Sequence, residues 1–94
     1  MTETFGEYIR KLRVQQKLPL RKIAAALDID TSILSKIERN EREAAKEMLP
    51  ILASTLEYPE KDLEIYFIKS QIQEKFGALK HLKEGLKELL KAYE

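Results

Sequence analysis

The sequence contains no cysteine and no tryptophan, and its 94 residues include only three glycines and three prolines. Without cysteine, the chain can form neither a disulfide framework nor a thiolate metal site. The single histidine, His81, cannot form a metal site or a catalytic relay by itself. Because glycine and proline are scarce, we expect long structural elements joined by short connections.

The chain also lacks several longer patterns. No segment approaches the roughly 18 consecutive apolar residues of a membrane span, and the N-terminus lacks the basic stretch and apolar core of a signal peptide. No Ser/His/Asp constellation, phosphate loop or glycine-rich fingerprint is present. We therefore expect an intracellular protein that is not an enzyme, needs no cofactor and has no membrane partner.

The composition is that of a foldable, helix-rich protein, with 44% hydrophobic and 35% charged residues. The net charge of +1 is divided unevenly along the chain. Residues 1–42 hold nine Lys and Arg against six Asp and Glu, a net charge of +3, whereas residues 43–94 hold eight against ten, a net charge of −2. This mild asymmetry is compatible with a nucleic-acid surface in the first half.

The first half of the sequence predicts three helices. Thr4 and Glu7 form a capping-box pattern for a helix that runs to about Lys17. Proline is favourable in a first helical turn, so a second helix begins near Pro19 or Leu20. Asp28 suits the left-handed turn that follows it, and Asp30 is a good N-cap for a third helix over about residues 31–39. Asn40 can end this helix in a left-handed conformation.

The second half predicts further helices. A fourth helix covers roughly residues 46–56, and Pro50 is tolerable there if the helix begins so late that Pro50 falls in its first turn or just after it. A fifth helix begins at Pro59. From there, apolar residues recur at spacings of three and four, which is typical of a helical seam: Ile65, Ile68, Ile72, Leu79, Leu82, Leu86, Leu89 and Tyr93. Gly77 interrupts this seam, and we expect a break there.

Two short helices joined by a three- to four-residue turn form a helix-turn-helix, here from Pro19 to Asn40. In such a unit the second helix lies in the major groove of DNA, where each base pair shows a distinct donor and acceptor pattern. The residues that we expect to contact DNA are Thr31, Ser32, Ser35, Lys36 and Arg39 on the outer face, Ile33 at its border, Arg42 just beyond, and Arg21 at the start of the preceding helix.

Residues 4–63 resemble the phage-repressor/Cro-like, or Xre-type, helix-turn-helix family. The matching words are Phe5-Gly6-Glu7-Tyr8-Ile9-Arg10-Lys11-Leu12-Arg13, Ile23-Ala24-Ala25-Ala26-Leu27-Asp28-Ile29-Asp30, Leu34-Ser35-Lys36-Ile37-Glu38-Arg39-Asn40 and Leu52-Ala53-Ser54-Thr55-Leu56. The resemblance implies a five-helix DNA-binding domain. It also implies an ion pair between Arg13 and Glu38, which makes Glu38 a structural residue although it lies on the recognition helix.

The sequence departs from the family at three positions. Asp28 and Asn40 stand where the family often has glycine, and both tolerate a left-handed backbone. Leu20 replaces the glutamine that often clamps a phosphate at the start of the second helix. This variant is similar to a subgroup of bacterial regulators, some of which look like restriction–modification controllers.

Together, these features predict an all-α fold: a helix-turn-helix DNA-binding domain over residues 1–63 and a C-terminal helical extension over residues 64–94. We expect a cytoplasmic, nucleoid-associated bacterial transcriptional regulator that binds a palindromic site as a homodimer. The expected dimer interface comprises Ile68, Ile72, Leu79, Leu82, Leu86 and Leu89. Two alternatives remain: an antitoxin whose C-terminal helices hold a toxin, and a protein-interaction module that has lost DNA binding.

Overall fold

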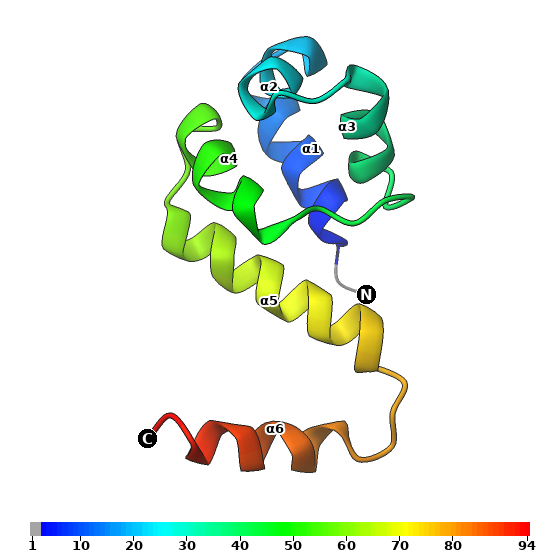
Figure 1. Cartoon of the computed structure of the whole chain (residues 1–94), viewed down its shortest axis with the longest axis vertical. Helices are drawn as coiled ribbons and strands as arrows, with labels where there is room; N and C mark the ends of the chain where they lie inside the picture. The colour runs from blue at the N-terminus through cyan, green and yellow to red at the C-terminus, as the bar shows by residue number, and fades with distance from the viewer. Residues whose placement is uncertain (1–2) are drawn as a thin grey trace.

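The described part of the chain, residues 3–94 of a computed structural model, consists of helices joined by short connections (Figure 1). The elements are α1 (Phe5–Gln15), α2 (Leu20–Leu27), α3 (Thr31–Glu38), a 3₁₀ helix η1 (Lys46–Met48), α4 (Leu49–Thr55), α5 (Glu60–Phe76) and α6 (Leu82–Lys91). The predicted all-α fold is therefore confirmed.

The capping box predicted for the first helix is present. The Thr4 hydroxyl accepts a hydrogen bond from the Glu7 backbone N–H at 3.1 Å, and Glu7 Oε1 accepts one from the Thr4 N–H at 2.8 Å. Helix α1 ends at Gln15, two residues before the predicted end. The reason is that Lys17 adopts a left-handed φ of 57°, which turns the chain toward α2.

The two left-handed positions predicted for the helix-turn-helix are present in the structure. Asp28 and Asn40 have φ values of 57° and 61°, in the left-handed region that asparagine and aspartate tolerate. Asp30 occupies the N-cap position of α3, but its side chain makes no capping hydrogen bond. Helix α3 ends at Glu38, so Arg39 is its C-cap rather than its last residue.

The predicted fourth helix is divided in two. Residues 46–48 form the 3₁₀ helix, and α4 begins only at Leu49, which places Pro50 in its first turn. A proline is harmless there, because the first backbone N–H groups of a helix have no partner within the helix. The α-helix thus begins about three residues later than predicted, and this late start meets the condition under which Pro50 is tolerated.

The core is built from α1 to α4 and the first turn of α5. Its buried apolar residues are Phe5, Ile9, Leu12, Ile23, Ala24, Leu27, Leu34, Ile37, Ala44, Leu49, Leu52, Ala53, Leu56 and Leu63. Tyr66 and Phe67 in α5 are half-buried against this core. The expected boundary between residues 63 and 64 thus falls inside α5, one side of which belongs to the core.

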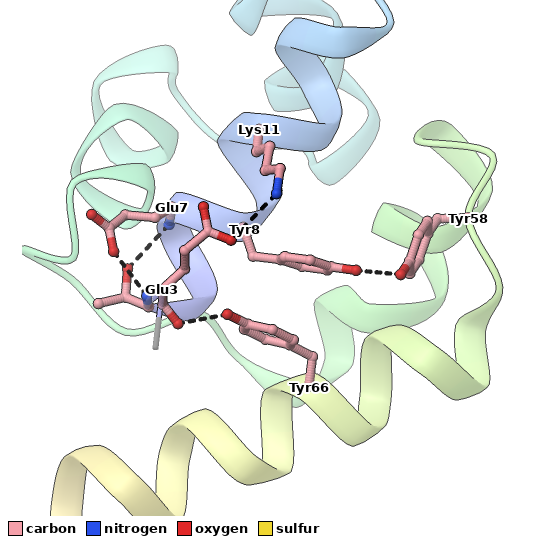
Figure 2. A network of polar contacts seen from close by, with 7 residues as sticks. Glu3, Glu7, Tyr8, Lys11, Tyr58 and Tyr66 are labelled. Atoms are coloured by element: carbon pink, nitrogen blue, oxygen red, sulfur yellow. Dashed lines mark hydrogen bonds and ion pairs between the residues drawn. The ribbon is translucent and has the colours of Figure 1, made fainter. Parts of the chain in front are cut away.

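A tyrosine cluster joins α1 to α5 beside the core (Figure 2). The rings of Tyr8 and Tyr66 stack with their centroids 4.0 Å apart, and Tyr58 meets Tyr8 edge to face. The hydroxyls of Tyr8 and Tyr58 are hydrogen-bonded, and the Tyr66 hydroxyl donates to the Glu3 carbonyl oxygen at 2.7 Å. These contacts stabilise the position of α5 against α1.

This cluster predicts a loss of stability at alkaline pH. Burial, together with the hydrogen bond between the Tyr8 and Tyr58 hydroxyls, raises the pKa of Tyr8 from 10.0 to about 12. The unfolded chain loses the Tyr8 proton near pH 10 while the folded chain keeps it, so this contribution to stability is present below pH 10 and is lost as the pH rises toward 12. Thermal unfolding followed between pH 8 and pH 12 measures the loss, which is expected to be smaller in Tyr8→Phe. Tyr93 is 80% exposed, so Tyr93→Phe should lose as much stability between pH 8 and pH 12 as the parent protein does. If Tyr93→Phe reduced this loss as much as Tyr8→Phe does, the loss could not be assigned to Tyr8.

The expected break near Gly77 is confirmed, since α5 ends at Phe76 and α6 begins at Leu82. Helix α6 lies beyond α5, on the side away from α1 to α4 (Figure 1). The apolar seam predicted from the sequence is therefore not one continuous stripe. It is divided between two helices that run in different directions.

Candidate nucleic-acid interface

Helices α2 and α3 are adjacent in the fold and form the predicted helix-turn-helix. They are joined by residues 28–30, and the left-handed Asp28 reverses the chain while Ile29 is half-buried against the core. The inner side of α3 carries Leu34 and Ile37, which are buried. The two helices lie at the end of the molecule opposite α6 (Figure 1).

The structure brings most of the expected DNA-contacting residues of α3 onto one outer stripe. Ser32, Ser35, Lys36 and Arg39 follow the spacing of three and four that places residues on one side of a helix. Ser32, Lys36 and Arg39 are exposed, whereas Ser35 is half-buried. Thr31 is exposed at the first turn, beside this stripe. The stripe thus presents two hydroxyls and two cations to the solvent.

Ile33 lies outside this stripe. Its side chain is half-buried and packs against the core. A half-buried Ile33 offers less apolar surface to a thymine methyl group than an exposed side chain would. The apolar burial of Ile33 helps to hold the first turn of α3 in place.

Arg39, at the end of the stripe, and two further arginines of the expected site, Arg21 and Arg42, are exposed. Arg39 forms an ion pair with Glu41, with Nε to Oε2 at 3.0 Å. Because both partners are exposed, this pair contributes little stability and can exchange for another anion. Arg42 lies in the loop after α3, and Arg21 lies in the first turn of α2. The N-terminus of α2 has no side-chain cap, so its first backbone N–H groups remain available to a phosphate.

A buried ion pair fixes the orientation of α3. Arg13 Nε lies 2.8 Å from Glu38 Oε2, and Arg13 Nη2 lies 3.0 Å from Glu38 Oε1, a bidentate arrangement. Arg13 Nη1 also donates to the Leu18 carbonyl oxygen at 2.9 Å. The hydrogen bonds that Arg13 donates to the Glu38 carboxylate raise the pKa of Arg13 above its ordinary value. The pair implied by the family resemblance is present, and Glu38 is only 4% exposed, so it lies on the inner side of α3.

Two contacts between the loop after α3 and the end of α5 were not expected from the sequence. The Asn40 side-chain amide donates to Glu74 Oε1 at 3.3 Å, and Lys75 Nζ lies 2.9 Å from Glu43 Oε1. The hydrogen bond from Lys75 lowers the pKa of Glu43. These partners are more than thirty positions apart in the chain, so no local pattern could have shown that they meet.

Two other kinds of site, a membrane-spanning helix and a metal site, have no support in residues 3–94. No helix in that range is both long enough and apolar enough to cross a membrane. No group of three or more His, Asp and Glu side chains in the same range is arranged to hold a metal ion.

Comparison with known protein families agrees with this geometry. The helix-turn-helix family profile HTH_3 matches residues 9–63, more than half of the chain, and this range includes both α2 and α3. Neither the curated proteins nor the solved structures give a match to the chain. The profile match, the helix-turn-helix geometry and the buried Arg13–Glu38 pair lead to one conclusion. The chain belongs to the Xre/Cro-like helix-turn-helix family of DNA-binding transcription regulators.

Proposed function

We propose that this protein is a sequence-specific regulator that inserts α3 into the major groove of double-stranded DNA. The observation that supports this most directly is the outer stripe of Ser32, Ser35, Lys36 and Arg39 on a helix held by a buried ion pair. The major groove admits one α-helix. A rigid recognition helix places its side chains against base edges with little loss of conformational freedom on binding.

The proposed roles of the contacting residues follow from their chemistry. Lys36 and Arg39 can donate to the O6 and N7 acceptors of guanine, and Ser32, Ser35 and Thr31 can contact bases or phosphates. Arg42 contacts the DNA backbone or minor groove, and Arg21 with the α2 N-terminus holds a phosphate. Leu20 cannot supply the side-chain phosphate clamp that glutamine provides in many relatives, so Arg21 and the backbone N–H groups take this part.

We further propose that the protein acts as a homodimer on a palindromic operator in the bacterial cytoplasm, similar to a restriction–modification controller. Two-fold symmetry would place two α3 helices in successive major grooves, about one turn of DNA apart. The proposed interface lies on α5, α6 and their connection: Ile68, Ile72, Leu79, Leu82, Leu86 and Leu89. Residues 64–94 then form a dimerisation element attached to the DNA-binding domain, with α5 shared between them.

The role of Lys36 can be tested by replacing it with alanine. We expect Lys36→Ala to weaken binding to the selected operator by about 1–3 kcal/mol, because a good contact to a base edge contributes that much to discrimination. Binding to random DNA should weaken far less. Titrations of both DNAs over a range of salt concentrations measure the two losses, after selection of bound sequences from random DNA has defined the operator.

Lys87→Ala is the matched control, since Lys87 is also an exposed helical lysine but lies on α6, far from α3 (Figure 1). It should leave operator affinity unchanged. If Lys36→Ala lowers the affinity for operator and for random DNA equally, Lys36 contacts a phosphate and not a base. If the parent protein shows no salt-sensitive DNA binding at low ionic strength, the protein-interaction alternative replaces the proposal. A co-purifying toxin would favour the antitoxin alternative.

A further inference from the structure

Helix α6 has a strongly apolar side, most of which no other part of residues 3–94 covers. It contributes no buried residue to the core. Its apolar positions lie together on one side of the helix: Leu82, Leu86, Leu89, Leu90 and Tyr93. Leu89, Leu90 and Tyr93 are more than half exposed. The opposite side carries lysines and glutamates from Lys83 to Lys91. An amphipathic helix of this kind is stable only when its apolar side is buried against another element.

A groove separates α6 from the rest of the molecule. It has a volume of about 590 Å³, and its lining combines apolar side chains with polar ones such as Gln73 and Glu74. Ile72 of α5 lies on one wall, and Leu82 and Leu86 of α6 lie on the other. Asn40, the residue that ends the turn after α3, also reaches its rim. The groove therefore lies between α6 and the loop that follows α3, and residues of both line it.

The exposed area of the whole chain shows how much surface is left to cover. A compact monomer of this mass, 11.0 kDa, exposes about 5,600 Å², whereas this chain exposes 6890 Å². The excess of about 1,300 Å² exceeds the roughly 800 Å² that each partner buries in a standard interface. The radius of gyration, 14.6 Å, is likewise larger than the about 12 Å of a compact chain of this length.

We propose that the groove between α5 and α6 receives helix α6 of a second copy of this chain, so that each copy inserts its α6 into the groove of the other. This inference rests on the proposed homodimer and specifies how it is built. The exchange brings α5 and α6 of both copies into one four-helix arrangement. It covers the apolar side of each α6 with the same groove residues, as a two-fold interface requires.

Three observations favour a second copy over other occupants. The apolar surface continues past the groove to Leu89, Leu90 and Tyr93, which a small ligand in the groove would leave exposed. The excess area is of the size that a dimer needs. The groove lining carries both signs of charge, in Glu3, Glu74 and Lys69, and this mixture does not favour a nucleic acid or an anionic membrane as the occupant.

The arrangement also couples dimerisation to the recognition helix. Asn40 lines the groove and donates its side-chain hydrogen bond to Glu74, which lines it as well. An inserted helix would lie against this contact and hold α5 and the end of α3 together. The distance between the two recognition helices would therefore be set by the same contacts that form the dimer.

Because the chain has no cysteine, single cysteines allow a clean test by cross-linking. One preparation carries Gln73→Cys in the groove wall of α5, and another carries Leu89→Cys on the apolar side of α6. When the two are mixed and treated with a short bismaleimide, we expect a cross-link between the two different chains. It should form at least tenfold more efficiently than in either preparation alone. A chain with both substitutions, highly diluted, should give little internal cross-link.

Other outcomes separate this inference from the proposed function. Cross-linking mainly within the diluted double variant would show that α6 closes on its own α5, and would overturn the inference. If sedimentation shows a dimer but cross-links form only between two Leu89→Cys chains, the homodimer would stand and the groove arrangement would be overturned. A monomer would overturn both the inference and the homodimer, while DNA binding by α3 is measured separately. Leu86→Lys gives a second test. It should fold normally, because α6 adds nothing to the core, and should weaken dimerisation at least tenfold; an undiminished dimer would overturn the inference.

Discussion

Replacing Glu38 with alanine is expected to lower the free energy of unfolding by about 3–5 kcal/mol, the usual effect of removing one partner from a buried ion pair. The substitution leaves the Arg13 guanidinium, whose side chain is only 14% exposed, with the Leu18 carbonyl as its remaining hydrogen-bond partner. Domains of this kind are stable by only about 5–15 kcal/mol, so much of the stability would be lost. Chemical denaturation of the variant and the parent protein measures the difference.

A double variant, Arg13→Met with Glu38→Leu, is the informative control. It removes both charges and fills the same space with apolar groups, so it should recover most or all of the lost stability. Glu38→Ala should also keep its affinity for DNA at a temperature where it remains folded, because Glu38 lies on the inner side of α3. A loss of affinity that the stable double variant shares would indicate that Glu38 contacts DNA and would contradict its structural role.

Replacing Gly6 with alanine is expected to destabilise the protein by at least about 1–3 kcal/mol, the usual effect of overpacking a core. A Cβ atom at Gly6 would lie 1.9 Å from the Ile37 carbonyl oxygen, a backbone atom that cannot rotate away. Helix α1 would have to move away from α3. That movement would also disturb the Arg13–Glu38 pair between the same two helices, so the effect should exceed that of a simple side-chain clash. Thermal unfolding measures the change.

Gly85→Ala provides the matched comparison, since a Cβ at Gly85 would meet nothing within 4 Å. In an exposed helix, alanine is more favourable than glycine by up to about 1 kcal/mol. Gly85→Ala should therefore not lower the midpoint of unfolding. Equal destabilisation by the two substitutions would show that the effect at Gly6 comes from something other than the close approach of α1 and α3.

The local features of the DNA-binding domain could be predicted from the sequence because each depends on residues close together in the chain. The Thr4–Glu7 capping box, the left-handed Asp28 and Asn40 and the position of Pro50 all follow from backbone geometry and local hydrogen bonding. The ends of the helices were less certain. Helix α1 stops early because Lys17 takes a left-handed conformation, and lysine gives no sign of this in the sequence.

The spacing of apolar residues in α5 does not predict which side of the helix faces the core. Leu63 and Phe67 lie on its inner side, and Ile65, Ile68 and Ile72 lie on its outer side or at the groove. A helix with apolar residues on two sides has no single apolar stripe, so its pattern cannot tell which side faces the core. The seam predicted from the sequence combined outer residues of α5 with those of α6 and could not show the angle between the two helices.

The sequence alone determined that the chain is helical, that residues 19–40 form a helix-turn-helix and that the exposed stripe of this unit carries hydroxyls and cations. These features depend on local propensity and on the spacing of apolar residues. Only the tertiary structure decided that Gly6 must lack a side chain, that Asn40 meets Glu74 and that a groove lies between α5 and α6. Each of these depends on how closely helices distant in the chain approach one another, which is set by the packing of the whole core and not by any short segment.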